Sequence, residues 1–444
     1  MQSIFSALDR REPERDADGI AKAIGRLVSD GELGAGDQLP TIRSVANHLG
    51  VSTSTVANAW SIMRKHGLIH TDRRRGTTVR PFAAHGRNRY WQVPNIGRRL
   101  DLDLSTGTPD PELLPPLEPI LARIQTDLEV TSYLDPPVLP DLETALQARW
   151  PYQPPALTVL DGANDGLDRV LSSLVRLGDV VVVEDPTYPL ILDQLQFLGA
   201  EIVGVGLDDD GPRQEDLTAA LERRPSVVVL QSGAHNPTGV SLTAQRAAAV
   251  AELIAPTSAV VVEDDHAGDT VARPPVSLGP ALPDRVYRIV SFSKTYGPDL
   301  RIAAVAGPVD GIDSIQRRRQ MGPGWTSRLI QRILLEMLDD DGVQRRIAEA
   351  AEAYAFRRKE LGRQLNGRGV EVTVGEGLNL WVPVGSEQLA TLGLAADGIG
   401  VSPGQPFRVR SGDPRIRVTA ANVRQEFDRV AAAIAQAADP RSIH

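Results

Sequence analysis

Lysine is rare in this chain, and one lysine stands where a primary amine could react with an aldehyde. The 444 residues include 48 lysines and arginines, and the lysines among them are Lys22, Lys65, Lys294 and Lys359. Lys294 occurs in SFSKTYGPDLR, at the end of an apolar segment. A lysine that is partly removed from water loses its proton readily and can form a Schiff base, whereas arginine stays protonated. The motif alone also allows a snorkelling or ion-paired lysine.

Lys294 is one of four polar residues at the ends of predicted strands. Four apolar segments rich in branched residues predict buried parallel strands, and they are residues 180–184, 226–230, 258–264 and 285–293. The polar residues at their ends are Tyr188, Asn236, Asp264 and Lys294. Helical patterns between the segments indicate an α/β fold with a mostly parallel sheet, in which ligands bind beyond the carboxyl ends of the strands. The sequence therefore predicts one site that contains all four residues.

The N-terminal part of the chain has the pattern of a winged helix-turn-helix. One helix is expected over residues 20–31, a second over 41–50 with Thr41 as its cap, and a third after the cap Ser52. Two short helices joined by a tight turn allow the later one to lie in the major groove of DNA. The alternating segment 68–80 surrounds a basic turn and predicts a two-stranded wing.

Charge is distributed unevenly along the chain. The net charge is −9, but residues 17–80 contain nine lysines and arginines against five acidic residues, a local charge of +4. The segment 81–100 lacks periodicity, which predicts a basic linker with Arg87, Arg89, Arg98 and Arg99. A basic segment in an acidic protein indicates a polyanionic partner for that segment, although a solvated basic face has the same composition.

Composition and motifs exclude several classes of protein. Hydrophobic residues make up 41% of the chain, so about two or three globular domains are expected. Cysteine is absent, which excludes disulfides and thiolate metal sites and fits a reducing compartment. The charged N-terminus and the lack of an apolar run of about 20 residues predict a cytoplasmic protein without membrane contact. His235 and His266 lack the spacing of a metal site, so no metal is expected.

The segment from about Gly19 to Val79 resembles the GntR-type winged helix-turn-helix, on the motifs GELGAGDQLPTIRSVANHLGVSTSTVANAWSIMRKHGLI and RRRGTTV. The resemblance implies that double-stranded operator DNA is a partner. The implied DNA contacts are Arg43, Ser52, Thr53, Ser54, Thr55, Arg75, Gly76 and Thr77. Thr53 and Ala57 stand where members of the family often have arginine. Phosphate contacts by hydroxyls and by the wing are therefore expected in place of guanine readout by this helix.

Residues 101–437 resemble the fold-type I pyridoxal-phosphate enzymes of the aminotransferase class I/II group, on the motifs DPTYP, SGAHNPTG, EDDHAGD and SFSKTYGPDLR. With the winged helix in front, the chain resembles the MocR subfamily of GntR regulators. The resemblance implies a pyridoxal 5′-phosphate cofactor held by Lys294 as a Schiff base. Asp264 would pair with the pyridine nitrogen and keep it protonated, and Tyr188 would stack on the ring.

The resemblance also implies how the rest of the cofactor and a ligand are held. Asn236 would hydrogen-bond the ring hydroxyl, and Arg417 in RIRVTAA would bind the carboxylate of a ligand. The implied phosphate contacts are Ser291, Ser293, Arg301, the backbone of Gly162, Ala163 and Asn164 where a helix begins, and Tyr133 from the other subunit of a homodimer.

Several positions depart from the pattern of the family, among them Val138, which stands near where many relatives have glycine. His266 stands where most relatives have a tyrosine that binds the ring hydroxyl, and an imidazole can donate the same bond but titrates near neutral pH. Ala163 replaces a common serine, which removes one hydroxyl from the phosphate site. The turn HNPTG has the form seen in the enzymes. We therefore expect the protein to bind the cofactor. We expect it to catalyse at most partial half-reactions of transamination.

The predicted organisation is an N-terminal extension (1–16), a winged helix-turn-helix (17–80), a basic linker (81–100) and an aminotransferase-like domain (101–444). Two functions use the same chemistry at Lys294. The first is a transcription regulator whose aminotransferase-like domain senses pyridoxal phosphate or a small amino compound. The second is a working aminotransferase with a DNA-binding appendage. The complete winged helix with its basic wing favours the regulator, because an enzyme has no need of it.

Overall fold

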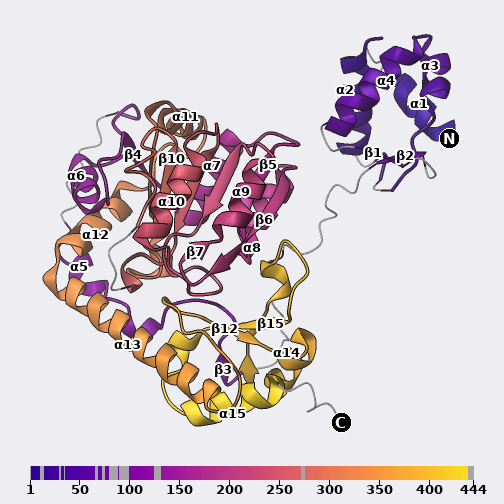
Figure 1. Cartoon of the computed structure of the whole chain (residues 1–444). Coiled ribbons are helices and arrows are strands. Elements are labelled where there is room, and N and C mark those ends of the chain that lie inside the picture. The colour runs from indigo at the N-terminus through magenta and orange to yellow at the C-terminus, as the bar shows by residue number, and fades with distance from the viewer. Residues whose placement is uncertain are drawn as a thin grey trace. The chain divides into compact units, whose positions relative to one another are not determined.

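The computed structural model describes residues 2–10, 15–29, 32–34, 36–65, 69–72, 76–79, 89, 100–124, 132–271 and 276–438. They divide into two units, one with the N-terminal 87 residues and the other with most of the remaining chain. Figure 1 shows the elements of both. No helix among these residues has the length and apolar content needed to cross a membrane.

The N-terminal unit is a winged helix-turn-helix. Its elements are α1 (Gln2–Arg10), α2 (Ala17–Ser29), α3 (Ile42–Leu49), α4 (Thr53–Lys65), β1 (Ile69–Asp72) and β2 (Gly76–Val79). Thr41 caps α3 by accepting a hydrogen bond from the N–H of Ser44, and Gly50 ends it with a φ of 65°. Ser52 Oγ accepts from the N–H of Thr55 at the start of α4. The antiparallel strands β1 and β2 form the predicted wing, but its turn, with Arg75, lies outside the described residues.

The extension 1–16 contains helix α1, which packs in the core of this unit. Leu8 of α1 is fully buried and Ile4 is 8% exposed, and both belong to the cluster that also contains Trp60 and Met63 of α4. Burial of these apolar side chains removes them from water, which stabilises the whole unit.

The second unit is built around an eight-stranded sheet in the order β4-β11-β10-β9-β8-β5-β6-β7. Its strands are β4 (Ala156–Leu160), β5 (Val180–Asp185), β6 (Glu201–Asp208), β7 (Gly211–Pro212), β8 (Val227–Leu230), β9 (Val260–Asp265), β10 (Val286–Ser291) and β11 (Ala303–Gly307). The strands β10, β9, β8 and β5 are parallel neighbours. These are the four predicted strands, and the predicted parallel sheet is confirmed for them. The pairs β10–β11, β11–β4 and β6–β7 are antiparallel.

Helices cover both faces of this sheet. The helices between residues 118 and 366 are α5 (Glu118–Leu121), α6 (Pro140–Arg149), α7 (Ala163–Leu174), α8 (Pro189–Phe197), α9 (Gln214–Leu221), α10 (Ala244–Ile254), α11 (Val309–Gln320), α12 (Arg328–Asp339) and the long α13 (Asp341–Asn366), whose C-terminal half packs on the C-terminal subdomain. Gly166 of α7 packs so closely on Ile289 and Val305 that a Cβ would lie 3.1 Å and 3.2 Å from their methyl groups. Leu146 of α6 and Leu334 of α12 share a cluster with Phe292. Residues 289 and 292 thus belong to opposite faces.

The C-terminal residues form a smaller subdomain with its own core. Its elements are β12 (Leu380–Pro383), α14 (Glu387–Ala396), β13 (Ile399–Gly400), β14 (Ser402–Pro403), β15 (Arg415–Val418) and α15 (Phe427–Ala438). The short strand β3 (Leu102–Asp103), which comes just after the linker in sequence, pairs with β13 of this subdomain. Leu104 is fully buried in the subdomain core, and its N–H donates to Gly400 O at 2.8 Å.

Candidate functional site

The carboxyl ends of the parallel strands surround a cavity of about 190 Å³, named here the Lys294 pocket. It brings together eleven of the residues proposed from the sequence: Ala163, Asn164, Tyr188, Asn236, Asp264, His266, Ser291, Ser293, Lys294, Arg301 and Arg417. These residues are spread over more than 250 positions of the chain, and the parallel strands bring them to one edge of the sheet.

Lys294 and Asp264 form the ionisable centre of this pocket. Asp264 is 1% exposed, and its Oδ1 has no hydrogen-bond partner in the described part of the chain. Burial raises the pKa of Asp264 to about 7, although the Lys294 ammonium opposes the shift. Burial likewise lowers the pKa of Lys294 to about 7, against the opposing effect of Asp264. A large fraction of Lys294 is therefore an unprotonated amine at neutral pH, which is the nucleophilic form.

Several hydrogen-bond donors gather at the start of α7. Gly162 precedes the helix with a φ of 99° and supplies no side-chain cap. The first N–H groups of a helix have no partner within the helix. The Arg301 guanidinium lies beside Gly162, because a Cβ on that glycine would be 3.1 Å from Arg301 Nη2. Ser291 and Ser293 line the same pocket. Helix N–H groups, a guanidinium and two hydroxyls are together suited to a phosphate group.

His266 is neutral in this environment. Its Nδ1 lies 3.9 Å from Asp264 Oδ2, and its side chain is 13% exposed. Burial lowers the pKa of His266 well below its usual range, and the positive charges of Lys294 and Arg417 lower it further. The prediction that His266 titrates near neutral pH is therefore wrong, because the sequence does not reveal how deeply this side chain is buried. A neutral imidazole can still donate one hydrogen bond.

Arg417 lies on the side of the pocket formed by the C-terminal subdomain. It is 4% exposed, and its Nη1 donates to Asn236 Oδ1 at 3.1 Å. Its guanidinium also donates to Ser105 O and lies 5.0 Å above the ring of Phe407. A Cβ on Gly107 would lie 3.0 Å from Nη1, so a glycine is needed there. Asn236, proposed for the ring hydroxyl of the cofactor, and Arg417, proposed for the carboxylate of a ligand, are thus directly hydrogen-bonded.

Two groups of residues in or next to this pocket were not predicted as part of it from the sequence, in which His235 was considered only as a metal ligand. Residues 106–109 line the Lys294 pocket, and their sequence TGTP lies shortly after β3. A turn rich in glycine, threonine and proline is the signal that could have found them. The second group is Glu184 and His235, whose Oε2 and Nε2 are 3.5 Å apart. Burial raises the pKa of Glu184 well above its usual range and lowers the pKa of His235 to about 3.

Tyr133 lies outside the Lys294 pocket of its own chain. Its side chain is 89% exposed, and its ring stacks on Trp325 with 5.9 Å between the ring centroids. The predicted contact with a phosphate in a second subunit stays a prediction.

Most of the residues proposed to contact DNA are among those that the structure describes, and they lie at the surface of the N-terminal unit. Arg43 on α3 and Thr53 and Ser54 on α4 are exposed. Ser52 Oγ lies 2.7 Å from both Ser54 Oγ and Thr55 Oγ1, so the start of α4 presents a group of linked hydroxyls. Hydroxyls at a helix N-terminus are typical phosphate ligands.

Comparisons with known proteins agree with this division of the chain. The family of bacterial regulatory proteins called gntR matches residues 16–79, and aminotransferase class I and II matches residues 101–434. PtsJ, a vitamin B6 salvage pathway transcriptional repressor of Salmonella typhimurium, is 33% identical over 95% of this chain and 98% of its own length. The chain belongs to the MocR-type GntR transcriptional regulators. PdxR, a pyridoxine biosynthesis transcriptional regulator of Corynebacterium glutamicum, is 26% identical to this MocR-type regulator over 79% of each chain.

Solved structures share the fold of the larger unit. A kynurenine aminotransferase from Pyrococcus horikoshii has a TM-score of 0.69 at 24% identity, over 76% of this chain and 91% of its own. LysN, an alpha-aminoadipate aminotransferase from Thermus thermophilus, has a TM-score of 0.70 at 20% identity, over 84% and 98%. The MocR-type regulator therefore has the fold-type I aminotransferase architecture.

The Lys294 pocket fits pyridoxal 5′-phosphate, the cofactor of this fold. It has an amine for an aldehyde, donors suited to a phosphate at the start of α7, and the buried Asp264 Oδ1 to accept a hydrogen bond from a protonated ring nitrogen. Within the described residues, no group of three or more histidine, aspartate and glutamate side chains is arranged to hold a metal ion. Pyridoxal phosphate is thus the cofactor of this MocR-type regulator.

Proposed function

We propose that this regulator controls genes of vitamin B6 supply and that pyridoxal phosphate, bound at Lys294, is its effector. The observation that supports this most directly is the Lys294 pocket, in which an amine of lowered pKa, a buried carboxyl and a group of phosphate-binding donors lie together. The names of PtsJ and PdxR connect relatives with the same two domains to vitamin B6. Because the chain matches PtsJ over 95% of its length, we transfer this biological context to the whole protein.

Each residue of the pocket has a proposed task. The bound cofactor supplies an aldehyde that condenses with primary amines and a ring that withdraws electrons. Lys294 holds the cofactor, and Asp264 keeps a proton on the ring nitrogen. Arg301 and the N–H groups of Ala163 and Asn164 hold the phosphate.

The remaining pocket residues orient the ring. Tyr188 stacks on it, and Asn236 and the neutral His266 bind its hydroxyl. Ser291 and Ser293 add hydroxyls at the phosphate. In a homodimer, Tyr133 of the other subunit completes the phosphate site, which explains why so large an aromatic side chain is exposed in one chain.

The winged helix-turn-helix is proposed to bind the operator. The hydroxyls at the start of α4, together with Arg43 and the wing residues Arg75, Gly76 and Thr77, contact phosphates. The regulator acts in the cytoplasm, where DNA and the cofactor are both available.

A gel-shift experiment with the protein's own upstream region tests the proposal. Pyridoxal phosphate should change the affinity for this fragment, and random DNA of the same length should compete weakly. The Lys294→Ala variant should still bind the fragment but no longer respond to the cofactor. Lys359→Ala, which removes an exposed lysine of α13, is the matched control and should respond like the original chain. An unchanged response in Lys294→Ala would contradict the proposal.

Arg417 favours a second candidate effector, a small amino compound with a carboxylate. Its guanidinium is buried at the pocket and held by Asn236 and Ser105, which pre-organises it for a bidentate contact. The test is a titration of the cofactor-loaded protein with amino acids while its visible spectrum is recorded. A spectral change that Arg417→Met abolishes would support this effector. Many turnovers with an added keto acid would instead support the aminotransferase function.

A further inference from the structure

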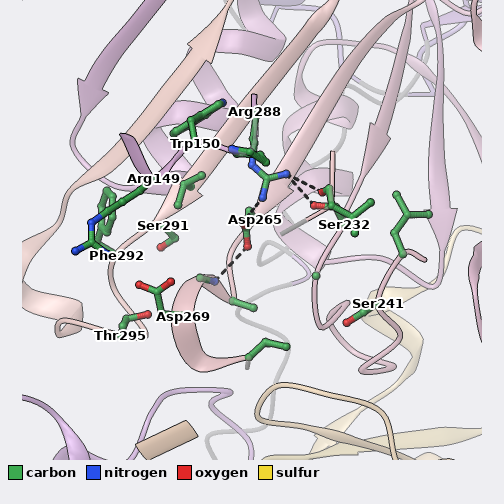
Figure 2. Close-up of a pocket in the computed structure, with 18 of the residues that line it drawn as sticks. Arg149, Trp150, Ser232, Ser241, Asp265, Asp269, Arg288, Ser291, Phe292 and Thr295 are labelled. Carbon is green, nitrogen blue, oxygen red and sulfur yellow. Dashed lines mark hydrogen bonds and ion pairs between the residues drawn. The ribbon is translucent and has the colours of Figure 1, made fainter. Parts of the chain in front are cut away.

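A second cavity lies on the face of the sheet that carries Arg288 and Phe292, and Figure 2 shows the residues around it. It has a volume of about 120 Å³ and is formed by β9 and β10, the end of α6 and the loop that contains Ser232 and Ser241. An engineered cavity of about 150 Å³ in another protein holds a benzene molecule. The second cavity is therefore of the size that one small ring compound requires.

The second cavity is distinct from the Lys294 pocket but adjacent to it. Ser291 lines both. Asp265 and Thr295 line the second cavity, whereas their sequence neighbours Asp264 and Lys294 line the Lys294 pocket. The two sites thus share the end of β9 and the segment that follows β10.

A hydroxyl without a partner is buried at this cavity. Thr295 is 4% exposed, and its Oγ1 has no hydrogen-bond partner among the residues that the structure describes. A Cβ on Gly268 would lie 3.2 Å from this oxygen, so the absence of a side chain there leaves space beside the hydroxyl. A buried polar group without a partner costs free energy, which a ligand with a hydrogen-bonding group would recover.

The floor of the cavity is a buried ion cluster of one arginine and two carboxylates. Arg288 is 1% exposed, and its Nη1 donates to Glu263 Oε2 at 3.0 Å while its Nη2 donates to Asp265 Oδ2. Figure 2 shows the contacts of Arg288 with Asp265 and Ser232. Arg149, Asp269 and Glu376 also line the cavity. The arginines Arg149 and Arg288 are outnumbered by the carboxylates of the lining and of Glu263. An anionic ligand would therefore meet more negative than positive charge, so the cavity disfavours an anion.

The walls are apolar and partly aromatic. Phe292 is 6% exposed, and Trp150, Leu146, Leu338 and Val290 complete the apolar lining. Aromatic side chains and branched aliphatic groups bind a ring by burial of its apolar surface. A purely aliphatic polar ligand would gain little from these walls.

From the size, the unpartnered hydroxyl, the excess of negative charge that disfavours an anion, and the apolar walls together, we propose that the second cavity binds an uncharged aromatic alcohol of about the size of phenol. The Thr295 hydroxyl exchanges a hydrogen bond with the ligand hydroxyl, and the ring lies against Phe292 and Val290. Because Ser291, Asp265 and Thr295 flank the cofactor-binding residues, ligand occupancy and cofactor affinity are coupled, and the coupling is reciprocal. The inference does not depend on which genes the protein controls.

Calorimetric titration of the full-length, cofactor-loaded protein with phenol tests this site. We expect saturable binding of one phenol per chain with a millimolar or tighter dissociation constant, as a ligand of seven non-hydrogen atoms allows. Benzoate, which has a ring of the same size and a negative charge, should bind at least about tenfold more weakly. Phenol should also shift the visible absorption of the bound cofactor or change its dissociation constant.

Two variants locate the binding. Val290→Phe fills the cavity and should weaken phenol binding at least about tenfold. Thr295→Val keeps the shape but removes the hydroxyl, and should weaken binding roughly fivefold, the value of one neutral hydrogen bond. Val309→Phe adds the same ring at an exposed position of α11 and is the control. It should bind phenol like the original chain.

Three results would overturn the proposal. The first is that phenol shows no saturable binding up to its solubility limit. The second is that benzoate and phenol bind with equal affinity, and the third is that Thr295→Val binds phenol as the original chain does. If Val290→Phe does not fold cooperatively, Thr295→Val alone decides, because it preserves the packing. Binding that is lost only in Lys294→Ala would place phenol in the Lys294 pocket and would also contradict the proposal.

Discussion

At the scale of single residues, the reactivity of Lys294 follows from its removal from water. Its pKa of about 7 means that the amine loses its nucleophilic form as the pH falls below that value. We therefore expect the rate at which the apo-protein binds pyridoxal phosphate to fall between pH 8 and pH 6, approaching about tenfold per pH unit below pH 7. Stopped-flow absorbance at a fixed cofactor concentration measures this rate. A rate that stays constant down to pH 6 would show that Lys294 keeps an even lower pKa.

Asp110 is a second residue whose effect can be measured. It is fully buried and accepts hydrogen bonds from Arg357 Nη1 at 2.7 Å and Arg424 Nε at 3.0 Å. Asp110→Asn removes the charge that both arginines need, so we expect a loss of about 2 to 3 kcal/mol in the free energy of unfolding. This loss of stability is smaller than the loss expected for a fully buried ion cluster. The reason is that 41% of the Arg424 side chain is exposed, so water screens part of its charge. Urea unfolding measures it, with the exposed Asp209→Asn as a control that should change little.

The sequence identified residues whose chemistry is local and missed those whose role depends on distant partners. Lys294, Asp264 and Asn236 could be found, because each stands at the end of a recognisable strand. The role of Asp110 could not, since its arginines lie 247 and 314 positions away. The neutral state of His266 depends on burial by several elements, which one sequence does not reveal.

At the scale of elements, helix α1 shows that a helix can be overlooked in the sequence when only two apolar residues mark its buried face. Ile4 and Leu8 are spaced by one helical turn, but charged residues follow directly, and the sequence analysis placed them in an extension. Leu8 has no exposed surface in the structure. We expect Leu8→Ala to reduce the stability of the N-terminal unit by about 2 to 4 kcal/mol. Thermal unfolding measures this loss through intrinsic fluorescence, to which Trp60 in the core of this unit contributes as one of the five tryptophans of the chain.

The exposed Asn47→Ala on α3 is the control for that experiment. Both variants replace a larger side chain by alanine, but only Leu8 fills part of the core. Equal unfolding temperatures of the two variants would show that α1 does not stabilise this unit.

The main sheet was predictable at its centre and less so at its edges. Branched apolar segments identified β5, β8, β9 and β10, because strands covered on both faces need such residues. The antiparallel β11 has the sequence AAVAG, whose small residues carry little strand signal. The order of the strands depends on long-range pairing, so no local pattern encodes it.

At the scale of the whole molecule, the exposed Tyr133 leads to a prediction about assembly. We expect a homodimer of about 96 kDa, twice the chain mass of 47.9 kDa, in light scattering. Tyr133→Ala and Lys294→Ala should each weaken cofactor binding. If Tyr133 acts on the other subunit, a refolded mixture of the two variants contains hybrid dimers with one intact site. About half of the cofactor sites in these hybrid dimers should then bind pyridoxal phosphate, as measured by absorbance.

Neither variant alone should recover binding after the same refolding. A mixture that binds no more cofactor than the average of the separate variants would show that Tyr133 does not act across a dimer. Arg10→Ala, at an exposed residue of α1, should behave like the original chain throughout.

The pairing of β3 with β13 determines what the linker is anchored to. Backbone hydrogen bonds connect residues 102–104 to the C-terminal subdomain. Ser105 O also accepts a hydrogen bond from Arg417 of the same subdomain. Any rotation of that subdomain relative to the main sheet must therefore carry the downstream end of the linker with it. A displacement that starts at the Arg417 guanidinium can reach residues 101–105, at the N-terminal edge of this unit, through a handful of hydrogen bonds, without passing through the eight-stranded sheet.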